Sequence, residues 1–486
     1  MRRQDDGPGS GGNGGGGEAL GTGMSDGLPM PRRMRAILAI SFGNALVVLD
    51  GAIATAALPT IARDLHVDSS AAVTIVTVYQ LVLVMLLLPF SGLGSRIGLK
   101  RMFQFGLMVF TVATVLCFFA RSLPFLLIVR MAQAIGAAAC LSVSQALLRN
   151  IYPRKHLGRG LGFNSLIVSS AGALAPPLGG FVLALGPWPW VFASAVPFAL
   201  LSLAFGRALP DPKLRPEPYD VLGALLCAGT FGLVIGGLES GVHGDSPVVS
   251  AAIVATGLLL GAMMVNREKD NPAPILPVDL LRRRVIALSV MGSFCAFIGS
   301  MCLLVSLSFR LQHEFAYSPA EAGAVLSLWP ITMMVVAPVA GNLSDKVPAG
   351  LLGGIGMAIG TVALLLLAWP PDHATYFDFG WRMALCGLGF GLFASPNARL
   401  IIGSAPPERT ASAGGLTSTT RLVGQTSGAT LVAALLAMNI GGGAIPCVVS
   451  AGLAFIAGIC SVARLRPSRK VDKLEAVEVR PVGPVR

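Results

Sequence analysis

Long apolar runs recur along the chain and are separated by short polar segments. Their positions predict fourteen helices, near residues 34–57, 70–92, 102–120, 124–148, 160–184, 188–206, 219–239, 247–266, 284–308, 319–341, 349–369, 377–402, 411–439 and 443–464. Because about 20 apolar residues cross a bilayer as a helix, each run is long enough to span a membrane. Transmembrane barrels have alternating strands of about ten residues, which this pattern excludes. The sequence therefore predicts an all-α integral membrane protein.

Composition supports this class of protein. Hydrophobic residues make up 54% of the 486 residues, charged residues 12%, and the mean hydropathy is +0.73. Soluble domains carry about 25% charged residues, so a lipid environment is indicated. All eight cysteines fall inside predicted helices without the spacing of metal ligands, and we interpret them as small apolar packing residues. We expect neither a metal nor a cofactor.

Basic residues are concentrated in every second loop. They are Arg32, Arg33 and Arg35; Arg96, Lys100 and Arg101; Arg149, Arg154, Lys155 and Arg159; Arg207, Lys213 and Arg215; Arg267, Lys269, Arg282, Arg283 and Arg284; Lys346 and Arg409; and Arg464, Arg466, Arg469 and Lys470. Since such residues collect in cytoplasmic loops, we expect a multi-pass protein of the cytoplasmic (inner) membrane with both termini in the cytoplasm. The net charge of +12 then reflects topology and anionic headgroups, so we expect membrane lipids, and no nucleic acid, as partners.

A short loop sequence occurs twice. The loop after the second helix reads SGLGSRIGLKR at residues 91–101, and the loop after the tenth reads GNLSDK at residues 341–346. Both share a small–x–Leu–small–x–basic core, as expected if a second half begins at the ninth helix. The expected domains are a disordered Gly-rich cytoplasmic tail (1–33), a six-helix bundle (34–206), a linker with two extra transmembrane helices (207–283), a second six-helix bundle (284–465) and a cytoplasmic tail (466–486).

Further motifs occur in a fixed order after Met34. They are LDGAIATAALP at 49–59, RMAQAIG at 130–136, AGALAPPLGG at 171–180, FRLQ at 309–312, SPAEAG at 318–323, PER at 407–409 and RLVG at 421–424. Together with the loop at 91–101, they resemble the fourteen-helix drug/proton antiporter family of the major facilitator superfamily. The resemblance covers nearly the whole chain after Met34. It implies two bundles plus two linker helices, and multidrug efflux driven by protons.

Two segments carry gating residues by this resemblance. They are Ser95, Arg96, Gly98, Lys100 and Arg101 in the loop after the second helix, and Pro176, Gly179 and Gly180 in the fifth helix. Ordinary alternatives stay open, because any cytoplasmic loop is basic and because small residues beside prolines also allow bending and close packing.

One gating position departs from the family pattern. Ser95 stands where the family carries Asp, so it can accept a hydrogen bond or cap a helix but brings no charge. By the resemblance, that Asp helps to hold the cytoplasmic side closed. The closing contact of the first half is therefore expected to be weaker here. We hypothesise that Asp345, which keeps the acidic position in the second copy of the motif, makes this closing contact instead.

Two charged residues lie well inside predicted helices. Asp50 is about seven residues from the outer end of the first helix, and Arg130 is about six residues into the fourth, which starts from the same face. An intramembrane charge costs about 2.5–3.5 kcal/mol on insertion scales and is by default a functional candidate. We hypothesise proton coupling, because burial favours the neutral acid whereas an arginine favours the carboxylate. A structural ion pair, or an Asp50 that caps the following loop, are the alternatives.

Six polar side chains in apolar helices are candidates for a substrate cavity. They are Tyr79, Gln133, Gln312, Asn397, Arg421 and Gln425. An apolar pocket with a few polar groups suits amphiphilic or aromatic ligands. Hydrogen bonds between helices are an equally good interpretation of each. Arg421, about ten residues into its helix, is too deep to reach the surface easily and needs an anion, a carbonyl or water.

Enzymatic motifs are missing from the sequence. It contains no HExxH, GxxxxGK[ST] or GxSxG, so we do not expect an enzyme, and we expect an ion gradient in place of ATP. Three functions remain: a drug/proton antiporter, a narrow exporter or importer of an endogenous metabolite, and a transport-inactive membrane sensor or scaffold. The first predicts small-molecule substrates, protons as the coupled ion and a monomer.

Overall fold

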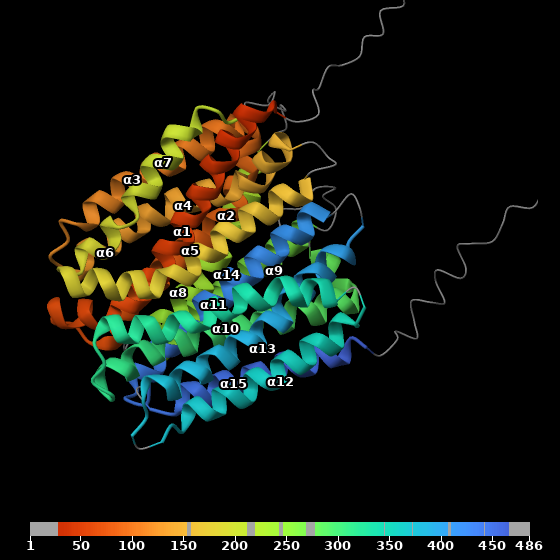
Figure 1. The fold of residues 1–486 in the computed structure, drawn as a ribbon. Coiled ribbons are helices and arrows are strands. Elements are labelled where there is room, and N and C mark those ends of the chain that lie inside the picture. Colours follow the sequence, from red (N-terminus) through yellow and green to blue (C-terminus); the bar gives the residue numbers. More distant parts are fainter. Residues whose placement is uncertain are drawn as a thin grey trace, which may run out of the picture.

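Helices make up all the regular structure that the computed structural model describes, which covers residues 28–152, 157–210, 219–242, 246–268, 278–344, 346–371, 373–406, 410–441 and 443–465 (Figure 1). The α-helices are α1 Met30–Asp64, α2 Ser69–Ile97, α3 Leu99–Cys117, α4 Leu123–Ile151, α5 Leu157–Leu185, α6 Pro189–Ala193, α7 Val196–Gly206, α8 Val221–Val242, α9 Pro247–Glu268, α10 Arg284–His313, α11 Pro319–Leu343, α12 Ala349–Ala368, α13 Tyr376–Gly403, α14 Thr410–Ala437 and α15 Ile445–Ala463. A 3-10 helix, η2 Val278–Arg282, precedes α10.

Among the described residues, 12 helical segments are long and apolar enough to cross a membrane, with α6 and α7 counted together. The chain is therefore a multi-pass membrane protein. The helices expected at 160–184 and 411–439 are α5 and α14, which are not among these 12 segments. The part of α5 whose side chains are all described, Ser170–Leu185, is an apolar helix but a short one, whereas α14 is rich in threonine, serine and glycine.

The helix expected at 188–206 is two helices in the structure. A turn at Ser194 and Ala195 separates α6 from α7, and Pro197 follows in the first turn of α7. Proline removes a backbone donor and disfavours helical geometry in the residue before it, which explains the break. At the other end of the first half, α1 begins at Met30, inside the tail expected over 1–33. Residues 1–27 and 466–486 lie outside the described residues.

The helices gather into two halves. In Figure 1, α1–α7 occupy the upper part of the molecule and α10–α15 the lower part. The larger apolar core is formed mainly by α1–α7, with residues of α10 and α14 packed into it, and a second core is formed by α10–α13 and α15. All eight cysteines are buried, as expected for packing residues. The seams between the halves are the contacts of α5 with α11, α2 with α14 and α1 with α10.

A close glycine crossing occurs in each half. A Cβ on Gly136 of α4 would lie 2.5 Å from the carbonyl oxygen of Gly106 in α3, and a Cβ on Gly389 of α13 would lie 2.5 Å from that of Gly356 in α12. Only glycine lets two helix backbones approach this closely. The third and fourth helices of each half therefore cross in the same way, which agrees with the repeat seen in the loop sequences.

The α8–α9 hairpin lies beside the two halves. Helix α8 packs against α2 and α14, whereas only 17% of the most apolar stretch of α9 is buried. Asp220 ties the hairpin together, since Arg267 Nη1 donates to its Oδ2 at 2.9 Å. The backbone N–H of Gly223 and this guanidinium hold the pKa of Asp220 below its usual value. The ion pair of Asp220 and Arg267 therefore stabilises the folded hairpin at neutral pH, and this contribution is lost as the pH falls and Asp220 becomes protonated.

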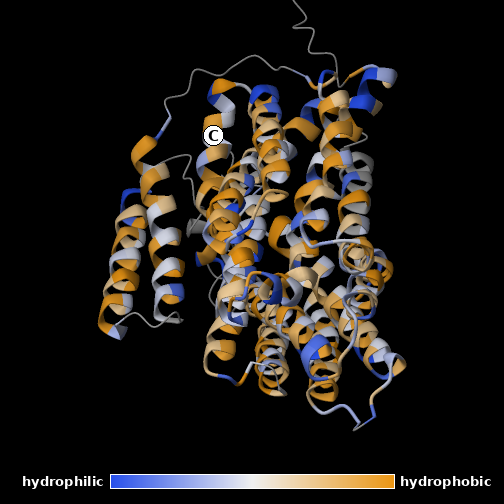
Figure 2. Ribbon diagram, turned by 90° about the vertical axis from the view of Figure 1, so that its left-hand side faces the viewer, coloured by the Kyte–Doolittle hydropathy of each residue, from blue (hydrophilic) through white to orange (hydrophobic). Residues whose placement is uncertain are grey.

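Many of the hydrophilic residues lie toward the helix ends, and hydrophobic residues predominate along the lengths between them (Figure 2). At one end, Arg32 Nε donates to Ala208 O, Lys100 Nζ to Arg207 O and Arg283 Nη1 to Ser404 O. We call this end, where α2 finishes and α3 starts, the basic end. The opposite end is where α1, α5 and α10 finish and α11 starts.

Candidate functional site

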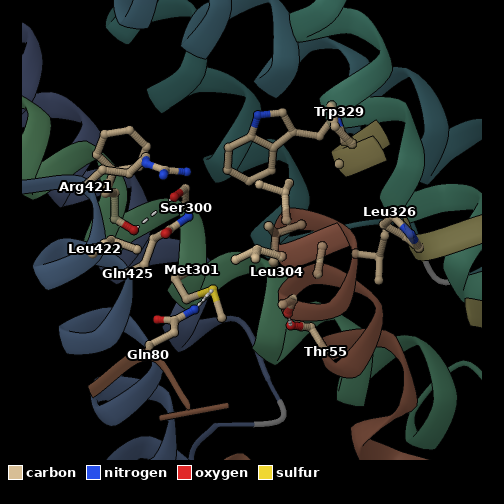
Figure 3. Close-up of a pocket in the computed structure, with 18 of the residues that line it drawn as sticks. Thr55, Gln80, Ser300, Met301, Leu304, Leu326, Trp329, Arg421, Leu422 and Gln425 are labelled. Atoms are coloured by element: carbon tan, nitrogen blue, oxygen red, sulfur yellow. Dashed lines mark hydrogen bonds between the residues drawn. The ribbon is translucent and has the colours of Figure 1, made fainter. Parts of the chain in front are cut away.

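A cavity of about 320 Å³ lies between the two halves. Helices α1, α2, α4 and α5 supply one wall, and α10, α11, α13 and α14 supply the other. Most of its surface is apolar, and its main polar side chains are Tyr79, Gln80, Arg421 and Gln425. Figure 3 shows Arg421 and Gln425 on one side of the space and Gln80 on another. The arrangement can hold one small, largely apolar molecule with a few polar groups.

Arg421 is the one Asp, Glu, Lys or Arg side chain among the residues that line this cavity. In the part of the chain that the structure describes, it makes no hydrogen bond or ion pair. The anionic partner expected from the sequence is therefore not supplied by a described side chain. Figure 3 shows its guanidinium directed toward the space beside Trp329.

Asp50 and Arg130 form an ion pair next to the cavity. Arg130 Nη1 donates to Asp50 Oδ2 at 2.6 Å, and both side chains are 0% exposed. Gln133 joins them, because its Oε1 accepts from Arg130 Nη1 at 2.8 Å while its Nε2 donates to Asp50 Oδ1 at 3.4 Å. The same Nε2 donates to Thr114 Oγ1 of α3 at 2.9 Å. The pair expected from sequence is thus present, inside a network that joins α1, α3 and α4.

Tyr79 separates this network from the cavity. Its ring lies 4.2 Å from Arg130 Cζ and also lines the cavity wall. On another side, the ring of Phe192 lies 5.2 Å from the same atom. Two aromatic faces can stabilise a desolvated guanidinium. Any molecule in the cavity therefore lies one aromatic side chain away from a buried acid and its counter-ion.

Three of the six candidate cavity residues lie on this wall, namely Tyr79, Arg421 and Gln425. Gln133 instead bonds to both members of the buried pair. Gln312 Nε2 donates to Ala56 O at 3.4 Å, at the opposite end. Asn397 Nδ2 donates to Ser293 Oγ at 2.7 Å, and Arg464 donates to its Oδ1. These amides are used in hydrogen bonds between helices, the alternative that the sequence left open.

Other residues of the site were not singled out from the sequence. Gln80 lines the cavity beside Tyr79, Thr114 accepts a hydrogen bond from Gln133, and the ring of Phe192 lies against Arg130. Gln80 is a polar residue in an apolar helix and meets the criterion that found its neighbour. Thr114 and Phe192 have no such signal, because threonine and phenylalanine are ordinary in membrane helices.

The halves meet closely at the opposite end. A Cβ on Gly180 of α5 would lie 2.5 Å from Pro319 O and 2.6 Å from the Cα of Ala320, both in α11. Gly323 of α11 in turn faces the backbone of Pro176. Across the seam between α1 and α10, Ser308 Oγ donates to Thr55 O at 3.2 Å. Gly179 faces Ile53 within the first half.

At the basic end, the segment 91–101, which was expected to be a loop, is helical except at Gly98, because it forms the end of α2 and the start of α3. This motif segment bonds within its own half, since Ser95 Oγ donates to Ser91 O at 3.3 Å and Lys100 bonds to Arg207 at the end of α7. Gly98 adopts a φ of 109°, which favours glycine, and Arg96 and Arg101 are exposed. Among the described residues, the motif segment makes no hydrogen bond or ion pair to the second half. Asp345 lies outside the described residues.

A family model matches this chain over most of its length. The model is that of the Major Facilitator Superfamily, and it matches residues 40–429 and, in a second match, residues 289–484.

Curated relatives include an uncharacterized transporter, YebQ of Escherichia coli, which is 42% identical over 85% of this chain and 91% of its own. The riboflavin transporter RibZ of Clostridioides difficile is 28% identical over 81% of this chain and 86% of its own. The multidrug efflux pump LfrA of Mycolicibacterium smegmatis is 26% identical over 79% and 77%, respectively.

Solved structures include a bacterial homologue of the human lysosomal transporter Spinster, in an inward-facing and unoccupied conformation. It superposes with a TM-score of 0.64 at 16% identity, over 91% of this chain and 100% of its own. At this identity the likeness concerns the fold alone.

A methyl group at Gly180 should separate the halves at the opposite end, because α5 and α11 must move apart to accommodate it. Spin labels on Asp64→Cys and Phe377→Cys report this separation, and the buried native cysteines leave labelling specific. In Gly180→Ala we expect double electron–electron resonance to show a longer label-to-label distance. The matched control is Gly236→Ala in α8, whose Cβ would meet nothing within 4 Å. An unchanged distance in Gly180→Ala would contradict a close seam here.

Proposed function

The chain belongs to the Major Facilitator Superfamily, a family of transporters and not of enzymes, and on that premise we propose that it exports small amphiphilic compounds in exchange for protons. The two halves would expose the cavity alternately to each side of the cytoplasmic membrane. The observation that carries the proposal is the fully buried pair of Asp50 and Arg130 beside the cavity. The proton gradient would supply the energy, with no cofactor.

The buried pair can couple proton and substrate movement. Without water, a carboxylate at this position depends on Arg130 and Gln133 for its charge to be stable. A movement of α1 against α4 that lengthens the 2.6 Å contact would favour uptake of a proton by Asp50. Because Tyr79 contacts both Arg130 and the cavity, a bound substrate would bias the same movement. We propose Asp50 as the proton carrier and Arg130 as its counter-charge.

We infer a topology of six, two and six helices. Helices α5 and α14, with 29 and 28 residues, are long enough to cross a bilayer and pack at the seams between the halves. They would complete bundles over 34–206 and 284–465, with α8 and α9 as the linker pair inside 207–283. The basic end would face the cytoplasm, with both termini on that side. One chain contains both halves, so a monomer would suffice.

Gating would alternate between the two ends. The contacts of Pro176, Gly179 and Gly180 support a seal at the opposite end. At the basic end, we propose that the segment from Ser95 to Arg101 closes against the second half in the other state. Ser95 brings no charge to that contact, and Asp345 would supply it from the second copy of the motif.

Asp50→Asn should abolish proton-driven efflux, because asparagine cannot carry a titratable proton. In proteoliposomes we expect substrate-driven proton flux to fall to the level of empty vesicles, whereas exchange of labelled for unlabelled substrate continues. Breaking a buried pair costs about 3–5 kcal/mol, so the exchange assay also reports whether the variant is folded. Asp64→Asn, the same change at an exposed position of α1, is the matched control. Proton flux retained in Asp50→Asn would remove Asp50 from the coupling role.

A narrow exporter or importer of one metabolite is the alternative. It is favoured by the similarity to a riboflavin transporter, whose name specifies one substrate. Expression in a host that lacks its own efflux pumps separates the two functions. Broad efflux predicts resistance to chemically unrelated dyes and antibiotics. Full sensitivity to all of them, with uptake or release of a single compound, would favour the alternative.

A further inference from the structure

We propose that the cavity selects substrates with a negative charge on an aromatic or otherwise apolar body, and that Arg421 is the counter-charge. This inference rests on the proposed export function and names the substrate class of the same cavity.

The charges around the cavity favour an anion. Arg421 is the one acidic or basic side chain on its wall, and no described residue pairs with it. The carboxylate of Asp50 lies behind Tyr79 and is already neutralised by Arg130. A cation held in a space of low polarity without a partner is unfavourable, and a bound anion offsets that cost. A cationic ligand would meet the uncompensated charge of Arg421 and no carboxylate on the cavity wall.

Two side chains of the cavity wall carry buried polar atoms without partners. Among the described residues, Tyr79 Oη and Gln80 Oε1 are buried without hydrogen-bond partners, and both side chains line the cavity. Gln80 Nε2 has only a 4.0 Å contact with Met301 Sδ. Buried polar atoms normally find partners, so a rotation of either side chain toward the cavity would give its atom a partner in a bound ligand. The Tyr79 hydroxyl and the Arg421 guanidinium are donors, as the oxygen atoms of a carboxylate or sulfonate require.

Three aromatic side chains also line the cavity. Phe390 lies 5.4 Å from Phe297 and 5.7 Å from Trp329, centroid to centroid, in edge-to-face contacts. Such faces bind an aromatic body by burial and stacking. The volume of about 320 Å³ is at the small end of ligand pockets, which favours a compact molecule such as a two-ring acid.

Anion export would also use the membrane potential. A negative charge that leaves the cell and a proton that enters both move in the direction favoured by an inside-negative potential. A cavity with a single cationic side chain would therefore serve a transport cycle in which both driving forces act together.

Three probes of the same shape test the assignment on the full-length purified protein in nanodiscs. They are 2-naphthoate, 2-naphthalenemethanol and 2-naphthylmethylammonium, and binding is measured by equilibrium dialysis without any gradient. We expect the carboxylate to bind about tenfold or more tightly than the alcohol, and the ammonium to bind most weakly. In Arg421→Gln the preference for the carboxylate over the alcohol should disappear. Arg421→Lys should keep it, and so should Arg63→Gln, a matched control at an exposed arginine of α1.

The measurement on the unmodified chain decides the matter even if Arg421→Gln does not fold. Equal binding of the three probes, tightest binding of the ammonium, no binding of the carboxylate, or an anion preference that survives in Arg421→Gln would each overturn the assignment. Anion preference without proton-driven movement of naphthoate in proteoliposomes would refute the proposed export and leave the binding site standing. If the ammonium bound most tightly and its movement were driven by protons, the anion site would be refuted and the proposed export would stand.

Discussion

The contact between Asp50 and Arg130 is the constraint on which the first half depends. Neither side chain has any exposed surface, so neither charge can be stabilised by water. Their partners come from α2, α3, α4 and α6, in the form of Tyr79, Thr114, Gln133 and Phe192. Four further helices are thereby held around one carboxylate of α1. Because this state stabilises the carboxylate of Asp50 so strongly, the helices must move before Asp50 can separate from Arg130 and take up a proton.

The second half repeats the architecture of the first but not this chemistry. Its third and fourth helices cross at Gly356 and Gly389 as α3 and α4 cross at Gly106 and Gly136. The arginine near the start of its fourth helix, Arg382, bonds instead to Asp378 one turn away. Another arginine of the second half, Arg421, faces the shared cavity without a partner among the described residues. Proton chemistry in one half and substrate charge in the other would give the duplicated fold two distinct roles.

Much of the fold follows from the sequence because burial in lipid makes apolar runs easy to recognise. The same reasoning finds Asp50 and Arg130, since a charge in such a run has few explanations. It cannot tell whether an amide faces a cavity or a neighbouring helix, and Gln312 and Asn397 are used in helix contacts here. The seam at Gly180 was also beyond it, because it depends on which elements become neighbours in space. The break between α6 and α7 was missed although Pro197 is a local signal for it.

The central claim is that Asp50 gains and loses a proton as the cavity is used. Infrared difference spectroscopy on the purified transporter, before and after addition of a transported compound, observes the carboxyl group directly. The account predicts a change in the C=O stretch of a protonated carboxylic acid that is absent in Asp50→Asn. A spectrum with no carboxylic-acid signal, or one whose signal persists in Asp50→Asn, would contradict it.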